Sequence, residues 1–366
     1  MIIYSQSGAT SSKLRPKAFT LVEVLVSMVI LAMIMLIITQ VIGQAQRSWQ
    51  SASSRVTQFR EARIAFDTIT RNLRQATINS YRNFVYANNT QVPNDIKEAP
   101  VGYKRYAELG FRTDNAAVLV SGGGSSASLP GHGVVFQAPL GKSITPGEIP
   151  GIPLYDQLKS LLCIRGYFVR YSSDGAFVPV GLRGRLEEKN RYRLYEYRPP
   201  SEVNSAYSEA ASGASIGDWT TINSGAASQF IAPVAENIIL LVLSPTFAQV
   251  EEDAAAPPRL SSRDQGGIYS YNSYLGVTGA AGQAVEPHRL PRSVQVSLVA
   301  IDEESAKRLA DQNGTGAPDL LGKSGASFTN PDVFEQDMIK LKGTLSDMRL
   351  NYRVFSSTVF IPGADV

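Results

Sequence analysis

The chain has 366 residues, enough for one large domain or two, and 43% of them are hydrophobic, which allows a substantial core. The net charge is only +3, and the Lys and Arg residues are scattered and not interleaved with aromatic residues along one element, so no nucleic acid is expected as a partner. The single cysteine, Cys163, excludes an intramolecular disulfide and leaves the compartment open.

The first element is an apolar segment near the N-terminus. Residues 24–38 contain no charge, and their only polar side chain is Ser27. Extended to Ile42, the segment approaches the roughly 20 residues that a helix needs to cross a bilayer. Cations precede it, which predicts that this end stays in the cytoplasm and that the chain after residue 45 lies outside the inner membrane. These cations are Lys13, Arg15 and Lys17.

Other interpretations of this segment stay open. Gly43-Gln44-Ala45 is a small-x-small pattern, so a signal peptide cleaved after Ala45 is one alternative. An uncleaved signal anchor is another, and a buried core helix is a third. Neither the signal peptide nor the signal anchor accounts for Glu23, the one carboxylate near the start of the segment.

Glu23 requires a partner, because a carboxylate in lipid is costly unless it is paired. A cut between Ala18 and Phe19 would free an α-amino group at Phe19, one helical turn from Glu23 and on the same face. The glutamate is therefore explained if the helix begins at Phe19 and if such helices pack against one another.

The stretch "KAFTLVEVLVSMVILAMIML" resembles the N-terminus of type IV pilins and pseudopilins. The resemblance implies that a prepilin peptidase cuts after Ala18 and methylates the new amine of Phe19. It implies that Thr20 and Leu21 are flanking motif positions and that Glu23 pairs with a neighbour's N-terminus during filament assembly. The family has Gly where this chain has Ala18, so we expect cleavage to be slower.

The function implied is that of a structural subunit, a minor pilin or pseudopilin of a type IV pilus, a type II secretion system or a related filament. The implied partners are other pilin subunits, prepilin peptidase and inner-membrane lipid, in a single-pass topology with an extracytoplasmic ectodomain. No catalytic activity, cofactor or metal is expected. The alternatives are a membrane-anchored ectodomain that binds a glycan, a surface or a secreted substrate, and a secreted protein cleaved after Ala45.

The helix is expected to continue beyond the membrane. From Trp49 to Ala76, apolar residues recur at steps of three or four, which predicts an amphipathic helix that ends near Asn79. The predicted organisation is a leader at 1–18, a transmembrane helix at 19–42, its amphipathic continuation at 43–79, and a β-rich globular domain at 80–366. The fold class is α+β, with the long helix packed on an antiparallel sheet that carries long loop insertions.

The ectodomain shows runs typical of strands separated by small-residue loops. Strands are predicted at 133–138, 161–173, 191–199, 236–245, 293–302 and 352–362, and a helix is predicted to start at Asn330 and run to about residue 350. The Gly/Ser/Ala-rich stretches between them are interpreted as loops or insertions and not as a second core. The segments around 233–245 and 289–304 resemble larger minor pilins and J-type pseudopilins, and the closing strand resembles pilin-like proteins of Verrucomicrobia gene cassettes.

Residues that often carry chemistry form no constellation in this sequence. His132 and His288 lie in Gly- or Pro-containing loops, and Cys163 lies in an apolar strand, where a core role is expected. The stretch 317–324 lacks the first glycine of a phosphate loop, and 311–316 starts like a calcium loop but lacks its closing glutamate. A sticky aromatic surface or ordinary packing are the two alternatives for Trp219, Tyr269, Tyr271 and Tyr274.

Overall fold

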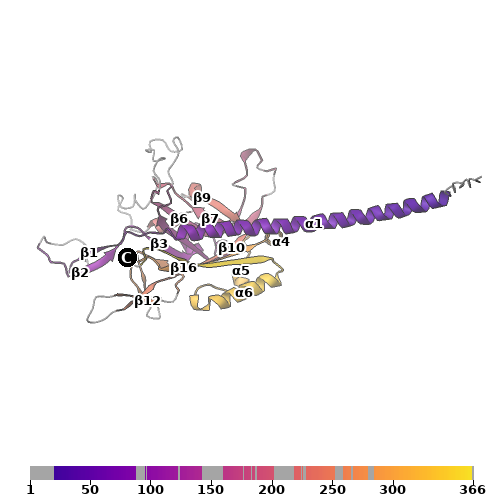
Figure 1. Ribbon diagram of the computed structural model, residues 1–366. Helices are drawn as coiled ribbons and strands as arrows, with labels where there is room; N and C mark the ends of the chain where they lie inside the picture. Colours follow the sequence, from indigo (N-terminus) through magenta and orange to yellow (C-terminus); the bar gives the residue numbers. More distant parts are fainter. Residues whose placement is uncertain are drawn as a thin grey trace, which may run out of the picture. The chain divides into compact units, whose positions relative to one another are not determined.

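A computed structural model describes most of the chain, in segments separated by gaps (Figure 1). The described residues are 20–87, 95, 97–122, 124–141, 160–175, 177–182, 184–185, 188–201, 218–223, 225, 228–251, 259–264, 267–278 and 284–364. The chain divides into two compact units, Met1–Ser53 and Ser54–Val366.

One long helix, α1 (Leu21–Leu73), opens the described chain (Figure 1). It ends at Leu73, before the predicted end near Asn79. The apolar stripe continues to the buried Ala76, but the α-helix ends before it. Gln75 N–H donates to the carbonyl of Asn72, three residues back, so the chain forms a tighter turn there. Thr77 N–H then donates to the carbonyl of Gln137, so the chain has already turned to meet a strand.

The larger sheet has six strands in the order β13-β3-β5-β6-β7-β9, and every neighbouring pair is antiparallel. Its strands are β3 (Phe111–Asn115), β5 (His132–Ala138), β6 (Cys163–Ser173), β7 (Asn190–Tyr197), β9 (Ile231–Glu236) and β13 (Tyr271–Asn272). Strands β5 and β6 are almost continuously buried, which explains why their sequences are apolar runs and not alternating patterns.

A second antiparallel sheet has the order β10-β16-β17, with β10 (Ile238–Thr246), β16 (Ser293–Ile301) and β17 (Tyr352–Phe360). It meets the larger sheet where Gly131 bridges Leu241. Gly131 has a φ of 73°, and a Cβ there would lie 2.4 Å from the Leu241 carbonyl oxygen, so this approach requires glycine. All six strands predicted from the sequence are confirmed.

Three further helices follow β16, namely α4 (Glu303–Asn313), α5 (Leu320–Ser324) and α6 (Phe334–Asp347). A short 3-10 turn, η5 (Pro331–Val333), precedes α6, and the Asn330 side chain caps it as predicted. The stretch 311–316 is the C-terminal end of α4, with Gly314 as its cap, and 317–324 contains α5, capped by Asp319. The first motif-like stretch is therefore a helix C-terminus, and the second contains a short capped helix.

Several short elements complete the fold. Strands β1 (Tyr81–Val85) and β2 (Gly102–Tyr106) form a two-stranded antiparallel ribbon of their own. The others are α2 (Ala116–Leu119), β4 (Val120–Ser121), η1 (Val180–Leu182), η3 (Asp218–Thr220), β8 (Ile222–Asn223), η4 (Ser228–Phe230), β11 (Ala248–Glu251), β12 (Arg259–Asp264), β14 (Val277–Thr278) and β15 (Ala284–Val285). Strands β4 and β8 are parallel, in contrast to the other pairs in the described residues.

The main core joins the last turns of α1 to both sheets and to the C-terminal helices. From α1 it takes Ala62, Ala65, Phe66, Ile69 and Leu73, all buried. Phe66 lies against Phe355 of β17, with 6.0 Å between ring centroids, and α6 contributes Met338, Leu341 and Leu345. The C-terminal part of α1 is therefore an integral part of the core of the globular domain.

A separate hydrophobic cluster lies on the other face of the larger sheet, and two residues of the small-residue stretches, Leu129 and Trp219, join it. Its other buried members are Ala116, Leu119, Val120, Val135, Ile164, Phe168, Tyr195, Tyr197, Ile222 and Ile231. Along β6, alternate side chains enter the two clusters, since Phe168 belongs to this one and Tyr167 to the main core. The larger sheet is thus covered on both faces.

Candidate functional site

The start of α1 carries a reciprocal set of hydrogen bonds between Thr20 and Glu23. Thr20 N–H donates to Glu23 Oε2 at 2.9 Å, and Thr20 Oγ1 donates to the same oxygen at 3.0 Å. In return, Glu23 N–H donates to Thr20 Oγ1 at 3.3 Å. This is a capping box, in which a Thr and a Glu three residues later satisfy the first free donors of a helix.

The capping box gives Glu23 partners within its own chain. Its negative charge also lies at the end of the helix where the macrodipole is positive, which stabilises a carboxylate there. The sequence explained Glu23 only by the α-amino group of Phe19, in the same subunit or in a neighbouring one, and missed this local role. The spacing Thr-x-x-Glu before an apolar run was the signal that would have revealed it.

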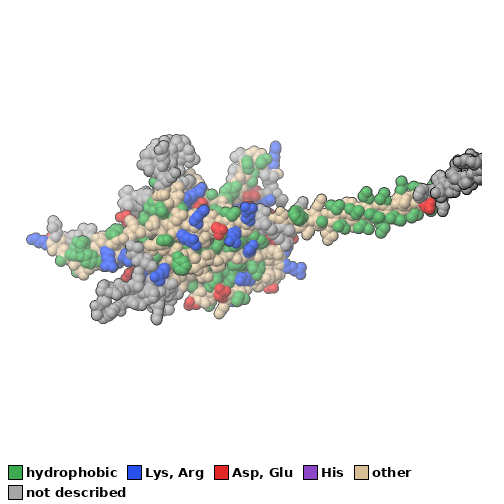
Figure 2. Space-filling model, in the orientation of Figure 1, with side chains coloured by type: hydrophobic (Ala, Val, Ile, Leu, Met, Phe, Trp, Pro, Cys, Tyr) green, Lys and Arg blue, Asp and Glu red, His purple; other side chains and the backbone are tan. Residues whose placement is uncertain are grey.

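The segment that follows is suited to lipid. Leu21–Trp49 is long and apolar enough to span a membrane, and none of it is buried within the protein. Figure 2 shows hydrophobic side chains along this part of α1. Two of its hydroxyls bond back to the helix, since Ser27 Oγ donates to the Val24 carbonyl and Thr39 Oγ1 donates to the Met35 carbonyl, both at 2.8 Å. Such bonds leave those hydroxyl donors satisfied without water.

The structure brings Thr20, Leu21 and Glu23 together in the first turn of α1. The predicted cleavage residues Ala18 and Phe19, and the basic leader at 1–18, lie outside the described residues. The side chains exposed from Leu21 to Ile42 form a continuous apolar surface that must be covered by lipid or by other helices.

A buried polar network fixes the other end of α1 to the larger sheet. Asn72 Nδ2 donates to the Tyr167 hydroxyl at 2.6 Å, and that hydroxyl donates to Glu196 Oε1 at 2.8 Å. Arg165 pairs with the same carboxylate at 3.4 Å. Burial and the Glu196 charge raise the pKa of Tyr167 far above its usual range, so the hydroxyl remains a donor. The network, which sequence reasoning missed, orients α1 on β6 and β7.

The residues that the sequence singled out for chemistry are structural. Cys163 is buried, and burial raises the pKa of its thiol, which keeps it protonated. Trp219, Tyr269 and Tyr271 are buried, and Trp219 Nε1 donates to the hydroxyl of the half-buried Tyr274 at 3.0 Å, so these aromatics are packing residues. Within the described residues no group of His, Cys, Asp and Glu side chains could hold a metal ion.

His132 is the most deeply buried titratable imidazole in the described chain. Its Nε2 lies 3.0 Å from the Phe328 carbonyl oxygen, and its Nδ1 accepts from Leu243 N–H at 3.2 Å. Burial lowers the pKa of His132 to about 4, although the Phe328 carbonyl and the charge of Asp114 oppose this effect. The ring is therefore a neutral connector between β5, β10 and the loop before α6.

Comparison with known proteins identifies the N-terminal segment. Residues 13–39 match the family model described as the prokaryotic N-terminal methylation motif. No curated protein matches the chain, and no solved structure matches it. The match covers the end of the basic leader, the capping box and much of the apolar helix, so the chain carries a type IV pilin-like prepilin motif. That family of motifs is structural.

Proposed function

We propose that this protein, which carries the prepilin-type methylation motif, is a minor pilin or pseudopilin, a structural subunit of a type IV pilus, a type II secretion system or a related filament. The observation that carries the proposal is the motif match at residues 13–39, which coincides with an apolar helix that could span a membrane. Prepilin peptidase hydrolyses the bond between Ala18 and Phe19 and methylates the amine of Phe19.

The proposed topology has one membrane span. The basic leader at 1–18 lies in the cytoplasm, residues 19–42 lie in the inner membrane, and the globular domain lies on the extracytoplasmic side. The helical continuation ends at Leu73 and seats the domain through its buried face. The partners are other pilin subunits, prepilin peptidase and inner-membrane lipid.

Glu23 has two successive sets of partners in this mechanism. In the isolated subunit the capping box holds the carboxylate on Thr20, which lowers the cost of keeping it in the membrane. During assembly the carboxylate pairs with the Phe19 amine of a neighbouring subunit, while the apolar helices pack together. The charge then provides attraction between subunits, and Thr20 provides a partner before assembly.

Substitution of Glu23 separates these two roles. Glu23→Gln keeps a side-chain oxygen that can accept from Thr20 but removes the charge. Because a charged hydrogen bond contributes about 1.5–3 kcal/mol, we expect the share of the protein recovered in sheared filaments with the other pilins to fall roughly tenfold or more. Unchanged recovery of Glu23→Gln with normal membrane insertion would contradict the assembly role.

The matched control is Thr20→Val, which removes the hydroxyl of the capping box and keeps the charge of Glu23. We expect this variant to assemble far better than Glu23→Gln. If the two variants were equally impaired, helix capping and not charge pairing would be the function of Glu23.

An anchored binding ectodomain is the second candidate. The exposed aromatic and basic side chains of the β1–β2 ribbon favour it, since this ribbon pairs with no other sheet in the described chain. In that case Glu23→Gln would spare both localisation and ligand capture. A secreted protein cleaved after Ala45 is less well supported, because α1 runs without interruption through residue 45.

A further inference from the structure

Strands β1 and β2 present cations and aromatic rings in alternation, which differs from the scattered arrangement expected from the sequence. The cross-strand pairs are Tyr81 with Tyr106, Arg82 with Arg105, Asn83 with Lys104, Phe84 with Tyr103, and Val85 with Gly102. Because side chains alternate between the two faces of a ribbon, Arg82, Arg105, Phe84 and Tyr103 share one face. The other face carries Tyr81, Tyr106 and Lys104.

Each face therefore combines an aromatic pair with positive charge. The ring centroids of Phe84 and Tyr103 are 5.1 Å apart, and those of Tyr81 and Tyr106 are 6.4 Å apart. Tyr103 is 68% exposed, and Phe84 and Tyr81 are each 44% exposed. A ligand that covers these exposed rings would bury apolar surface, which favours binding.

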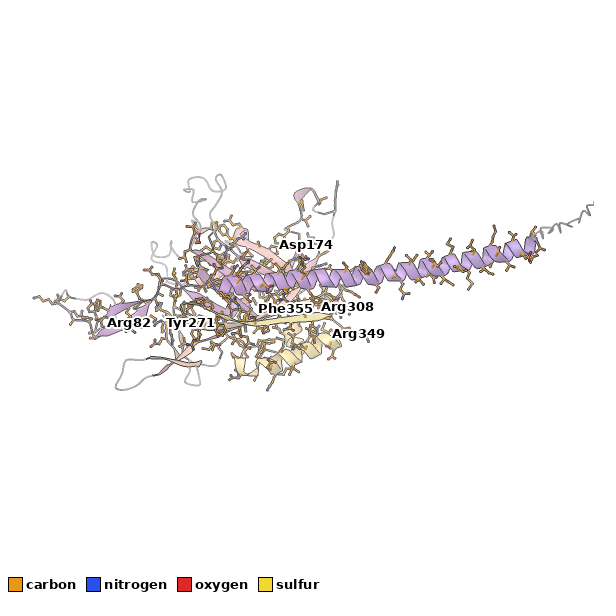
Figure 3. All side chains as sticks on the ribbon, viewed as in Figure 1. Arg82, Asp174, Tyr271, Arg308, Arg349 and Phe355 are labelled. Atoms are coloured by element: carbon orange, nitrogen blue, oxygen red, sulfur yellow. The ribbon has the colours of Figure 1, made fainter. Side chains whose placement is uncertain are left out.

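Arg82 and Arg105 lie directly opposite each other, and like charges in that position destabilise a strand pair. Arg82, which is labelled in Figure 3, is exposed. Arg105 is half-buried and already has an interaction within the protein, so Arg82 is the cation of this pair that is more accessible to an anionic ligand.

The base of the ribbon is rigid, so it presents this surface in a fixed orientation. Asn79 Oδ1 accepts from the backbone N–H groups of Glu108 and Leu109 at 3.0 and 2.9 Å. The Tyr274 hydroxyl donates to the Glu108 carbonyl at 2.6 Å, and Tyr106 lies against His288 with 5.1 Å between ring centroids. A preorganised surface loses little entropy when it binds.

We propose that the β1–β2 ribbon binds single-stranded nucleic acid. Along each strand, side chains on one face are separated by about 6.6 Å, so a cation and a ring follow each other closely. Phosphates and bases also alternate along a single strand, and aromatic rings stack on any unpaired base while cations neutralise phosphates. This inference revises the expectation that no nucleic acid is a partner, and it stands independently of the proposed filament function.

Two other anionic partners fit less well. A flat bilayer contacts one face of the ribbon at a time, whereas both faces carry rings and cations. An acidic polysaccharide offers charge and sugar C–H groups that can pack on the rings, but it has no planar π-face that stacks on them as a base does.

The test measures binding of a fluorescein-labelled oligothymidylate to the full chain in detergent micelles, by anisotropy, from 50 to 200 mM salt. Phe84→Leu with Tyr103→Leu should weaken binding at least about fivefold without changing the salt dependence, because stacking carries no charge. Arg82→Gln with Lys104→Gln should lower the slope of log K against log salt by about 1.4, since each phosphate contact on a single strand contributes about 0.7.

The matched control removes two positive charges outside the ribbon, with Lys307→Gln and Lys323→Gln at two exposed lysines. This control should leave the affinity for the oligonucleotide unchanged. The proposal is overturned if the oligonucleotide does not bind or if the control weakens binding as much as the ribbon variant. Two competitors without bases are also tested, namely polyglucuronate and phosphatidylglycerol added to the micelles. The proposal is overturned if either one displaces the oligonucleotide from the wild type as well as it does from the variant with Phe84→Leu and Tyr103→Leu. Circular dichroism of each variant establishes that the fold is retained.

Discussion

The structure gives His132 and Glu23 roles that differ from those their sequence context suggested. His132 looked like a loop histidine between two glycines, yet its ring lies in the core and each nitrogen has a backbone partner. The sequence did not reveal this, because Phe328 and Leu243 are distant along the chain. Glu23 is the opposite case, since both its motif and its capping partner Thr20 lie within a few residues.

At the residue scale we predict that His132 makes stability depend on pH. The unfolded chain has a histidine pKa near 6.5, whereas in the folded protein the pKa of His132 is about 4. As pH falls from about 6.5 to 4, the unfolded state binds the proton first, so the free energy of unfolding falls by about 3 kcal/mol from this group. Below pH 4 the group causes no further loss.

Chemical denaturation of the full chain in detergent at several pH values provides the measurement. His132→Gln keeps a donor for the Phe328 carbonyl but cannot titrate, so its stability should decline less steeply over this window than that of the wild type. His288, whose pKa is also lowered by burial, titrates in both proteins and cancels in the comparison. Parallel pH profiles for the two proteins would refute the assignment.

At the element scale, long buried elements could be predicted from the sequence and short ones could not. Most of the six predicted strands are rich in apolar or aromatic residues and largely buried, whereas β17 is mostly exposed or half-buried and was predicted from its β-branched and aromatic residues. By contrast β3 (Phe111–Asn115) reads "FRTDN", and it becomes a strand because β5 and β13 pair with it. Helix α4 was missed because Ala306 and Leu309 are almost its only buried apolar residues.

The element-scale prediction concerns the attachment of α1. Tyr167→Phe removes the hydroxyl that joins Asn72 to Glu196 and leaves a buried amide and a buried carboxylate short of a partner. The free energy of unfolding should fall by about 1–3 kcal/mol, measured by urea denaturation. Tyr103→Phe removes a hydroxyl from a largely exposed ring and should change stability by less than about 0.5 kcal/mol. Equal effects of the two changes would contradict the role of the network.

At the scale of the whole molecule, the candidate site could be predicted from the sequence, whereas much of the core packing could not. The site is local, because leader, capping box and apolar helix are continuous from residue 13 to residue 49. The packing of the globular domain is not local, since Trp219 and Leu129 lie in stretches rich in small residues but join the same cluster on the larger sheet. Such isolated apolar residues have no periodicity from which burial could be predicted.

The division into Met1–Ser53 and Ser54–Val366 predicts a boundary for stable fragments. A chain that starts at Ser54 keeps every α1 residue of the main core and should fold cooperatively, as judged by calorimetry. A chain that starts at Thr77 loses Phe66, Ile69 and Leu73, which at about 1.5–3 kcal/mol each is comparable to the whole stability of a domain, and it should not fold. Folding of the shorter chain would show that α1 is not part of the core.

Processing as a prepilin is tested by the mass of the N-terminal peptide of the protein purified from membranes. We expect a chain that starts at Phe19 and carries one methyl group on its α-amine. Unprocessed molecules that start at Met1 should accompany it if Ala18 slows cleavage. A population that starts only at Met1 would show a plain signal anchor, and one that starts only at Gln46 would show a secreted protein, so either result would refute prepilin processing.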